Sequence, residues 1–273
     1  RIDPATGGLA LIGTTDTGAN PSYVKTGRGG RYLFSSYYGA GKAAVHAIAE
    51  DGSLSRQAEQ FLNTAPRAHS IVPDNSNRYV FVSHTAPNQI FQFLFDEKTG
   101  KLTPNSPAAV TTPETHQPRH IFFHPNHKTA YVSNEKGSSV TVYQMDPSSG
   151  ALRAVQTLST LPDGFSESNT CADVEVTPSG KFVYVSNRGH DSIAGYSVDA
   201  DTGKLIALGQ TPTEKTPRSF NIDPSSRFLY SAGQGSGKLA SYRIDPESGR
   251  LDRFDTFVVG PSPAWVLVVE TSP

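Results

Sequence analysis

Short segments with apolar residues at consecutive positions recur along the chain at wide, regular intervals. The clearest are Tyr79-Val-Phe-Val82, Ala130-Tyr-Val132, Phe182-Val-Tyr-Val185 and Phe228-Leu-Tyr230. Their β-branched and aromatic residues favour strands, and a strand that is apolar at consecutive positions must be covered on both faces. The pattern therefore predicts strands in sheets that each pack between two neighbouring sheets.

A turn of the form Asp-x-x-x-Gly-x-Leu lies between these segments. Its copies, one of them shortened to Asp51-Gly-Ser-Leu54, end at Leu9, Leu54, Leu102, Leu152, Leu205 and Leu251. These leucines are 45, 48, 50, 53 and 46 residues apart. A strand repeat of about fifty residues is typical of a β-propeller, in which each repeat forms a four-stranded blade. We therefore expect an all-β fold with a single propeller domain over residues 1–273.

The two ends of the chain do not match a whole number of repeats. The first residues, Arg1-Ile-Asp-Pro4, match Arg243-Ile-Asp-Pro246 at the end of a third strand, and Trp265-Val-Leu-Val-Val269 reads as an inner strand. This arrangement predicts four complete blades with parts of blades at both ends. It also leads us to expect that N-terminal strands are missing.

Composition narrows the range of partners. The chain has 273 residues and a formal charge of −1, without a basic run, so we expect no nucleic-acid partner. Its longest apolar stretches are strand-sized, and we expect no membrane partner. Cys171 is the one cysteine, which excludes an internal disulfide and favours a small buried residue. These features are compatible with a cytoplasmic protein, which we take as the expected location.

Charged residues cluster where the repeat places the start of the first strand of a blade and the end of the second, which lie on one face. The first strands begin within the units Pro66–Pro73, Pro118–Pro125 and Pro217–Pro224 and supply Arg67, His69, Arg119 and Arg218. The second strands end at His84, Asn134, Glu135, Asn187, Arg188 and Gln234. Converging guanidinium groups form a site for an anion, and a carboxylate or imidazole beside them can move a proton.

Structural interpretations of the same residues stay open. A repeated Pro-Arg also serves to tie loop carbonyls between blades, and a lone His69 is often a satisfied structural histidine. Strand alternation places His120 on the side away from Arg119. The histidines His116, His120, His124 and His127 do not have the spacing of a zinc site, so we expect no metal.

Four stretches resemble the lactonase family of seven-bladed propellers, which includes propeller-type 6-phosphogluconolactonases and carboxy-muconate cyclases. They are Gln117–Asn126 with Tyr131–Val140, Pro212–Asn221, and the terminal Gly260–Val266. The resemblance implies a site built from His69, Arg119, Glu135 and Arg218, which we expect to be catalytic. Arg67, His84, Asn134, Asn187, Arg188 and Gln234 are then expected to bind substrate.

The resemblance implies hydrolysis of 6-phospho-D-glucono-1,5-lactone to 6-phosphogluconate in the oxidative pentose phosphate pathway. It implies a small anionic lactone as the partner, no cofactor, and a monomer or weak homo-oligomer. Two alternatives remain: a lactone-forming cyclase that acts on a carboxylated muconate, and a propeller scaffold without catalysis. Arginines serve phosphate and carboxylate equally well, so residue types do not separate the two enzymes.

Overall fold

The computed structural model describes residues 1–271, which contain 20 strands and no helix. The strands form five antiparallel sheets of four strands, each built from consecutive strands of the chain. The all-β expectation is confirmed, whereas the count of four complete blades is wrong. The additional sheet begins with Tyr23–Thr26, a short strand whose residues are exposed or half-buried and of which only Tyr23 and Val24 are apolar.

Contacts divide the chain into two compact units. Residues 1–112, 147–151 and 270–271 form the first, and residues 113–146 and 152–269 form the second. The first unit holds two sheets: β1 (Tyr23–Thr26), β2 (Tyr32–Tyr37), β3 (Lys42–Ala47) and β4 (Gln60–Asn63); then β5 (Ala68–Pro73), β6 (Tyr79–His84), β7 (Gln89–Asp96) and β8 (Lys101–Thr111). Their facing sides enclose one core in which Phe34, Val45 and Ile71 are completely buried.

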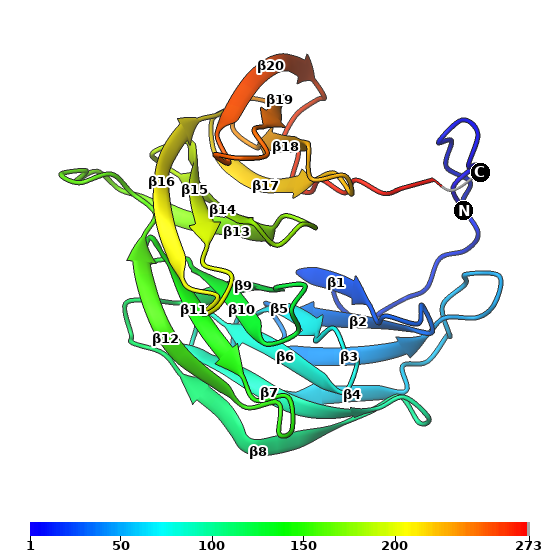
Figure 1. Ribbon diagram of the computed structural model, residues 1–273. Coiled ribbons are helices and arrows are strands. Elements are labelled where there is room, and N and C mark those ends of the chain that lie inside the picture. Colours follow the sequence, from blue (N-terminus) through cyan, green and yellow to red (C-terminus); the bar gives the residue numbers. More distant parts are fainter. Residues whose placement is uncertain (272–273) are drawn as a thin grey trace. The chain divides into compact units, whose positions relative to one another are not determined.

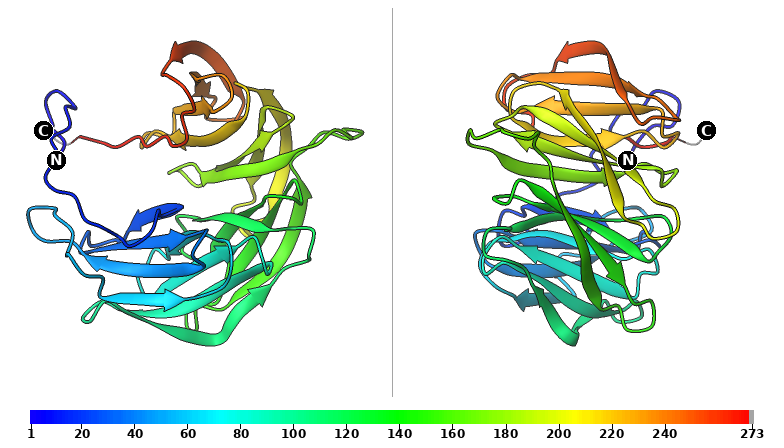
Figure 2. Two further views of the ribbon diagram at one scale, coloured as in Figure 1. Left: turned by 180° about the vertical axis from the view of Figure 1, so that it is seen from behind. Right: turned by 60° about the vertical axis from the view of Figure 1, so that its left-hand side comes forward.

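Three sheets make up the second unit and are stacked one after another (Figures 1 and 2). They are β9 (Pro118–Phe123), β10 (Thr129–Asn134), β11 (Ser139–Met145) and β12 (Leu152–Ser159); β13 (Thr170–Val176), β14 (Phe182–Arg188), β15 (Ser192–Val198) and β16 (Leu205–Pro212); and β17 (Pro217–Ile222), β18 (Phe228–Gly233), β19 (Lys238–Ile244) and β20 (Leu251–Val258). The second strand of the first sheet, β10, is buried along its whole length, as its apolar sequence predicts. One core fills each interface between these sheets.

The repeated turn and the aromatic second strand are bonded to each other across the sheets of the second unit. The Tyr131 hydroxyl donates to the carbonyl of the turn residue Gly203 at 2.9 Å, and the Tyr184 hydroxyl donates to that of Gly249 at 2.7 Å. A buried tyrosine requires such a partner for its hydroxyl. Each aromatic strand therefore anchors the turn of the following sheet, which explains why both features repeat together.

The turn has the geometry that its sequence predicts. The Asp245 carboxylate accepts hydrogen bonds from the backbone N–H of Ser248 at 2.7 Å and from the Ser248 hydroxyl at 2.8 Å. Gly249 follows with a φ of +69°. Aspartate closes such turns with its side chain, and glycine adopts the left-handed conformation without a Cβ penalty. The described residues contain no helix long and apolar enough to cross a membrane.

Candidate active site

The first strands of the sheets that carry the candidate arginines each contain a β-bulge. In β9, Pro118 pairs with Asn134 and His120 with Ser133, which leaves Arg119 as the extra residue. In β17, Pro217 pairs with Gly233 and Ser219 with Ala232, so that Arg218 is the extra residue. Bulges redirect one side chain and are frequent beside active sites. The two arginines therefore occupy the same special position in their sheets.

His69 occupies this bulge position in β5, because Ala68 pairs with His84 and Ser70 with Ser83. The alignment that grouped Arg67 with Arg119 and Arg218 is therefore wrong. Arg67 precedes the strand and is exposed, with a φ of +58°. Its counterparts are Gln117 and Thr216, which have φ values of +57° and +56°. The residue that follows the proline is not equivalent in the three strands, because Pro66 lies two residues farther from the bulge than Pro118 or Pro217.

Arg119, Glu135 and Arg188 form a charge cluster in the second unit. Arg188 Nη2 donates to Glu135 Oε1 at 2.8 Å and to the carbonyl of Cys171 at 2.9 Å. Arg119 Nε lies 3.8 Å from Glu135 Oε2. The Glu135 side chain is 23% exposed, whereas Arg119 and Arg188 are 2% and 13% exposed. The carboxylate therefore sits at the accessible edge of a largely buried group of arginines.

The three arginines of the cluster keep donors without a hydrogen bond. The buried Nε atoms of Arg119 and Arg188 have no hydrogen-bond partner within residues 1–271. Arg218 is half-buried, and its guanidinium likewise makes no hydrogen bond or ion pair to a described residue. Burial and Arg188 lower the pKa of Arg218, while Glu135 raises it, so the three groups share one electrostatic environment. Unsatisfied buried donors are costly, and an anion would satisfy them.

Arg119 is held differently from Arg218. Its Nη1 donates to the carbonyl of Ala172 at 2.7 Å and lies 3.1 Å from His120 Nε2. Burial and Arg188 lower the pKa of Arg119 to about 9, and the neighbouring Glu135 and Asp173 oppose this shift. The group is still charged at neutral pH. With one nitrogen fully engaged and 2% of its side chain exposed, Arg119 is suited to hold Glu135, whereas Arg218 is free to contact a ligand.

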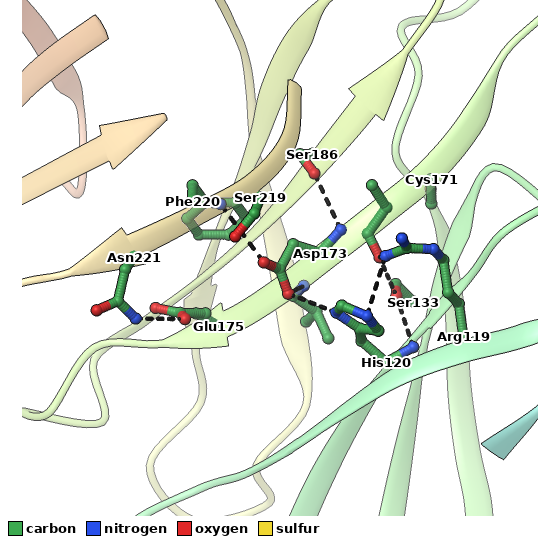
Figure 3. Close-up of polar contacts among 12 residues, drawn as sticks. Arg119, His120, Ser133, Cys171, Asp173, Glu175, Ser186, Ser219, Phe220 and Asn221 are labelled. Atoms are coloured by element: carbon green, nitrogen blue, oxygen red, sulfur yellow. Dashed lines mark hydrogen bonds and ion pairs between the residues drawn. The ribbon is translucent and has the colours of Figure 1, made fainter. Parts of the chain in front are cut away.

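The structure adds His120 and Asp173 to this neighbourhood (Figure 3). His120 Nδ1 lies 2.7 Å from Asp173 Oδ1, and both side chains are buried. The expectation that His120 points away from Arg119 is wrong, because the bulge at Arg119 interrupts the alternation on which it depended. Asp173 comes from β13, 53 residues away, and no local motif marks it.

The expected substrate-binding amides have structural contacts. Asn134 Nδ2 donates to the hydroxyls of Ser139 and Thr141, and Asn187 Nδ2 donates to the carbonyl of Thr160 at 2.8 Å. Both asparagines are completely buried. Gln234 is half-buried and donates to the Ser262 hydroxyl at 3.3 Å. These bonds hold strand ends and loops, and we leave the two asparagines out of the proposed site.

Two further candidates, His69 and His84, belong to the first unit. His69 is buried on β5, and its ring lies edge-on to that of Tyr38 with 5.6 Å between centroids. His84 is completely buried, with Nδ1 3.0 Å from the carbonyl of Val82 and Nε2 3.0 Å from the Thr64 hydroxyl. Both contacts of His84 are within the fold, and they leave its ring no free nitrogen for a substrate.

Acid should weaken the fold through His84. Its burial lowers the pKa to about 4, from 6.5 in the unfolded chain. As pH falls from 6.5 to 4, the unfolded chain takes up a proton that the folded protein does not bind, so the free energy of unfolding decreases. The decrease is about 3 kcal/mol over this window. Urea unfolding at several pH values should show a shallower pH dependence for His84→Gln than for the wild type, and parallel curves would contradict the assignment.

The cluster offers no evident site for a metal. Within residues 1–271, no group of three or more His, Cys, Asp or Glu side chains is arranged to bind an ion. His124, from the histidine-rich segment, instead lies with Nε2 2.9 Å from the carbonyl of Gly180. Cys171 is completely buried, as expected, and burial raises the pKa of its thiol to about 12. The ionisable groups at the cluster are therefore guanidinium, carboxylate and imidazole.

Comparison with known proteins identifies relatives over nearly the whole chain. The family model described as lactonase, 7-bladed beta-propeller, matches residues 1–268. Proteins named 6-phosphogluconolactonase from Pectobacterium carotovorum subsp. carotovorum and Serratia proteamaculans are each 38% identical over 270 residues, which is 98% of this chain and 80% of the relative. The periplasmic gluconolactonase of Pseudomonas aeruginosa has a TM-score of 0.88 at 29% identity, over 97% of this chain and 77% of its own. These findings confirm the resemblance, and the chain belongs to the lactonase family of seven-bladed β-propellers.

Proposed function

We propose that this chain hydrolyses 6-phospho-D-glucono-1,5-lactone to 6-phosphogluconate, as the names of its relatives suggest. The observation that carries the proposal is the unpaired guanidinium of Arg218 beside the Glu135 carboxylate, which two further arginines surround. The combination suits a substrate with an anionic group and a carbonyl that water must attack. The proposal includes a cytoplasmic enzyme that acts as a monomer or weak homo-oligomer on a small anionic lactone.

In the proposed reaction Glu135 acts as the base. Its carboxylate takes a proton from water as the water oxygen bonds to the lactone carbonyl carbon. The carbonyl oxygen becomes an oxyanion, which a guanidinium of the cluster stabilises. The bond between the carbonyl carbon and the ring oxygen then breaks, and the ring oxygen takes up the proton that Glu135 accepted from water, so that it becomes a hydroxyl and the carboxylate is regenerated. The product is one open-chain hydroxy acid. The reaction balances with water alone and transfers no electrons.

Arg218 is the proposed contact of the substrate phosphate. Its free guanidinium can donate two parallel hydrogen bonds to phosphate oxygens. Arg119 and Arg188 hold Glu135 in place through the two ion pairs. His69 remains a proposed catalytic residue on the family resemblance, and Arg67 a proposed contact of the substrate on the sequence alone.

The test is hydrolysis of freshly generated 6-phosphogluconolactone, corrected for the spontaneous rate. Arg218→Ala should raise KM roughly 10- to 100-fold, the cost of a charged hydrogen bond. It should change the rate on unphosphorylated glucono-1,5-lactone much less. Arg250→Ala is the matched control, because Arg250 is exposed and paired with Asp252 at 2.9 Å. A folded wild-type protein that accelerates neither lactone, or that instead cyclises a carboxylated muconate, would overturn the proposal.

A further inference from the structure

We propose that His120 and Asp173 form a positioning pair that fixes the Arg119 guanidinium and, through it, the Glu135 carboxylate. The inference rests on the proposed lactone hydrolysis, in which Glu135 is the base. It adds two residues that do not contact substrate but that determine how fast the base works.

The hydrogen-bond roles of the pair allow only one form of the imidazole. An ionised Asp173 carboxylate only accepts, and a guanidinium only donates. His120 lies between them, with Nδ1 2.7 Å from Asp173 Oδ1 and Nε2 3.1 Å from Arg119 Nη1. The ring must therefore be neutral, carry its proton on Nδ1 and accept at Nε2. A proton on Nε2 would face the N–H of Arg119 and push the guanidinium away.

Burial supports the neutral form. Burial and the charge of Arg119 lower the pKa of His120 to about 4, against the opposing effect of Asp173. Burial alone would raise the pKa of Asp173, but His120, Arg119 and the Ser219 side chain together bring it below its ordinary value. At neutral pH the pair is thus a carboxylate beside a neutral imidazole.

The planarity of the guanidinium transmits this constraint to Glu135. Both hydrogens of Arg119 Nη1 are engaged, one with the carbonyl of Ala172 at 2.7 Å and one with His120. Fixing this nitrogen fixes the plane and therefore the direction of Nε, which lies 3.8 Å from Glu135 Oε2. Loss of the acceptor at His120 would free the guanidinium to rotate, and Glu135 would lose one of its two ion-pair partners.

Asp173 also reaches the strand that carries Arg218. Its Oδ2 accepts from the backbone N–H of Phe220 at 3.4 Å (Figure 3), and the neighbouring Ser219 side chain helps to lower its pKa. Ser219 directly follows the bulged Arg218. One buried carboxylate therefore supports both arginine positions, on β9 through His120 and on β17 directly.

If His120 only joined the strands, two matched substitutions would have other effects than if it positions Arg119. In His120→Asn the amide nitrogen can take the place of Nδ1 and keep the bond to Asp173, but nothing accepts from Arg119. In His120→Gln the amide oxygen can take the place of Nε2 and keep the acceptor for Arg119, but the bond to Asp173 is lost. Both variants place a neutral amide at the same position. Comparing their kcat values therefore shows whether the bond from His120 to Asp173 or the acceptor for Arg119 matters for catalysis.

We expect kcat for 6-phosphogluconolactone to be about tenfold higher in His120→Gln than in His120→Asn. This factor corresponds to the contribution of one hydrogen bond to a charged group. KM should be similar in the two variants, because Arg119 holds the base and Arg218 the phosphate. Equal kcat values, or a higher kcat in His120→Asn, would overturn the inference. Imidazole ¹⁵N shifts of the wild-type protein give an independent test, with a proton expected on Nδ1 of His120 and a bare Nε2.

Asp173→Asn and Glu175→Gln form the second comparison. Glu175 lies two residues along β13, and its carboxylate likewise bonds to β17, at Asn221 Nδ2 (2.6 Å) and the N–H of Ile222 (3.0 Å). Asp173→Asn should lower kcat tenfold or more relative to Glu175→Gln at similar stability, and equal values would count against the inference. If wild-type protein hydrolyses no lactone, the proposed function fails by itself, and a proton found on Nε2 of His120 in that protein would overturn the pair as well.

Discussion

Substitution of Glu135 by glutamine should lower kcat for 6-phosphogluconolactone by a factor of about 10² to 10⁴, the usual contribution of a general base. Glutamine has nearly the same shape and can still accept the hydrogen bond from Arg188 Nη2, which now spans 2.8 Å. It cannot take a proton from water. The loss should therefore appear in kcat, with KM changed little, in initial rates from which the spontaneous hydrolysis has been subtracted.

The matched control is Glu247→Gln, because Glu247 is an exposed partner of Lys181 outside the cluster. It removes the same charge and should leave kcat unchanged. Glu135→Gln should also lower Tm, since it leaves Arg119 and Arg188 without their counter-charge. Circular dichroism at the assay temperature must show a folded variant. A folded Glu135→Gln protein with wild-type kcat would show that another group is the base.

The repeat made most of the fold predictable, because each part of it corresponds to a physical need. Gly249 adopts a φ of +69°, which favours glycine, and the buried aromatic Tyr184 must find a partner for its hydroxyl. Both requirements can be recognised from the residue types alone. The sheet that begins at β1 is not predicted because Tyr23–Thr26 is short and incompletely buried, and only Tyr23 and Val24 are consecutive apolar residues in it. Its place follows from pairing with β2 rather than from its own residues.

The candidate site was predictable in its residue types but not in its register. Arg119, Glu135 and Arg188 stand at strand ends that the repeat places on one face, and the structure brings them together. The register depends on a bulge, which inserts one residue without any marker in the sequence. The prolines that precede these strands do not mark the bulge, because Pro66 lies three residues before His69 whereas Pro118 lies directly before Arg119.

His120 and Asp173 show a second limit of the sequence. Strict alternation in β9 would turn His120 away from Arg119, and one bulged residue reverses that conclusion. Asp173 belongs to another sheet, where it lies within a bulge between Cys171 and Val174. Contacts between the first strands of successive sheets are made by side chains, so they cannot be predicted from a pattern of backbone pairing. Only the three-dimensional structure brings this carboxylate to the imidazole.

Replacing Gly249 by alanine should destabilise the protein by about 2 to 5 kcal/mol. Two costs add: about 1 to 2 kcal/mol for a side chain in the left-handed conformation, and about 1 to 3 kcal/mol for overpacking. A Cβ at this position would lie 2.5 Å from Cδ1 of the buried Phe182 and 2.9 Å from Cδ1 of Leu208. Either the ring or the turn must move, and the Gly249 carbonyl would be displaced from the Tyr184 hydroxyl, now 2.7 Å away.

Gly7→Ala separates the two costs. Gly7 is the glycine of the first copy of the turn and has the same φ of +69°, but nothing lies within 4 Å of the Cβ that alanine would add. It should therefore lose only about 1 to 2 kcal/mol, the backbone cost. Urea unfolding of both variants and the wild type measures the difference directly. If the two substitutions cost the same, the turn contributes only its backbone conformation, and packing of the turn against the preceding aromatic strand does not hold successive sheets together.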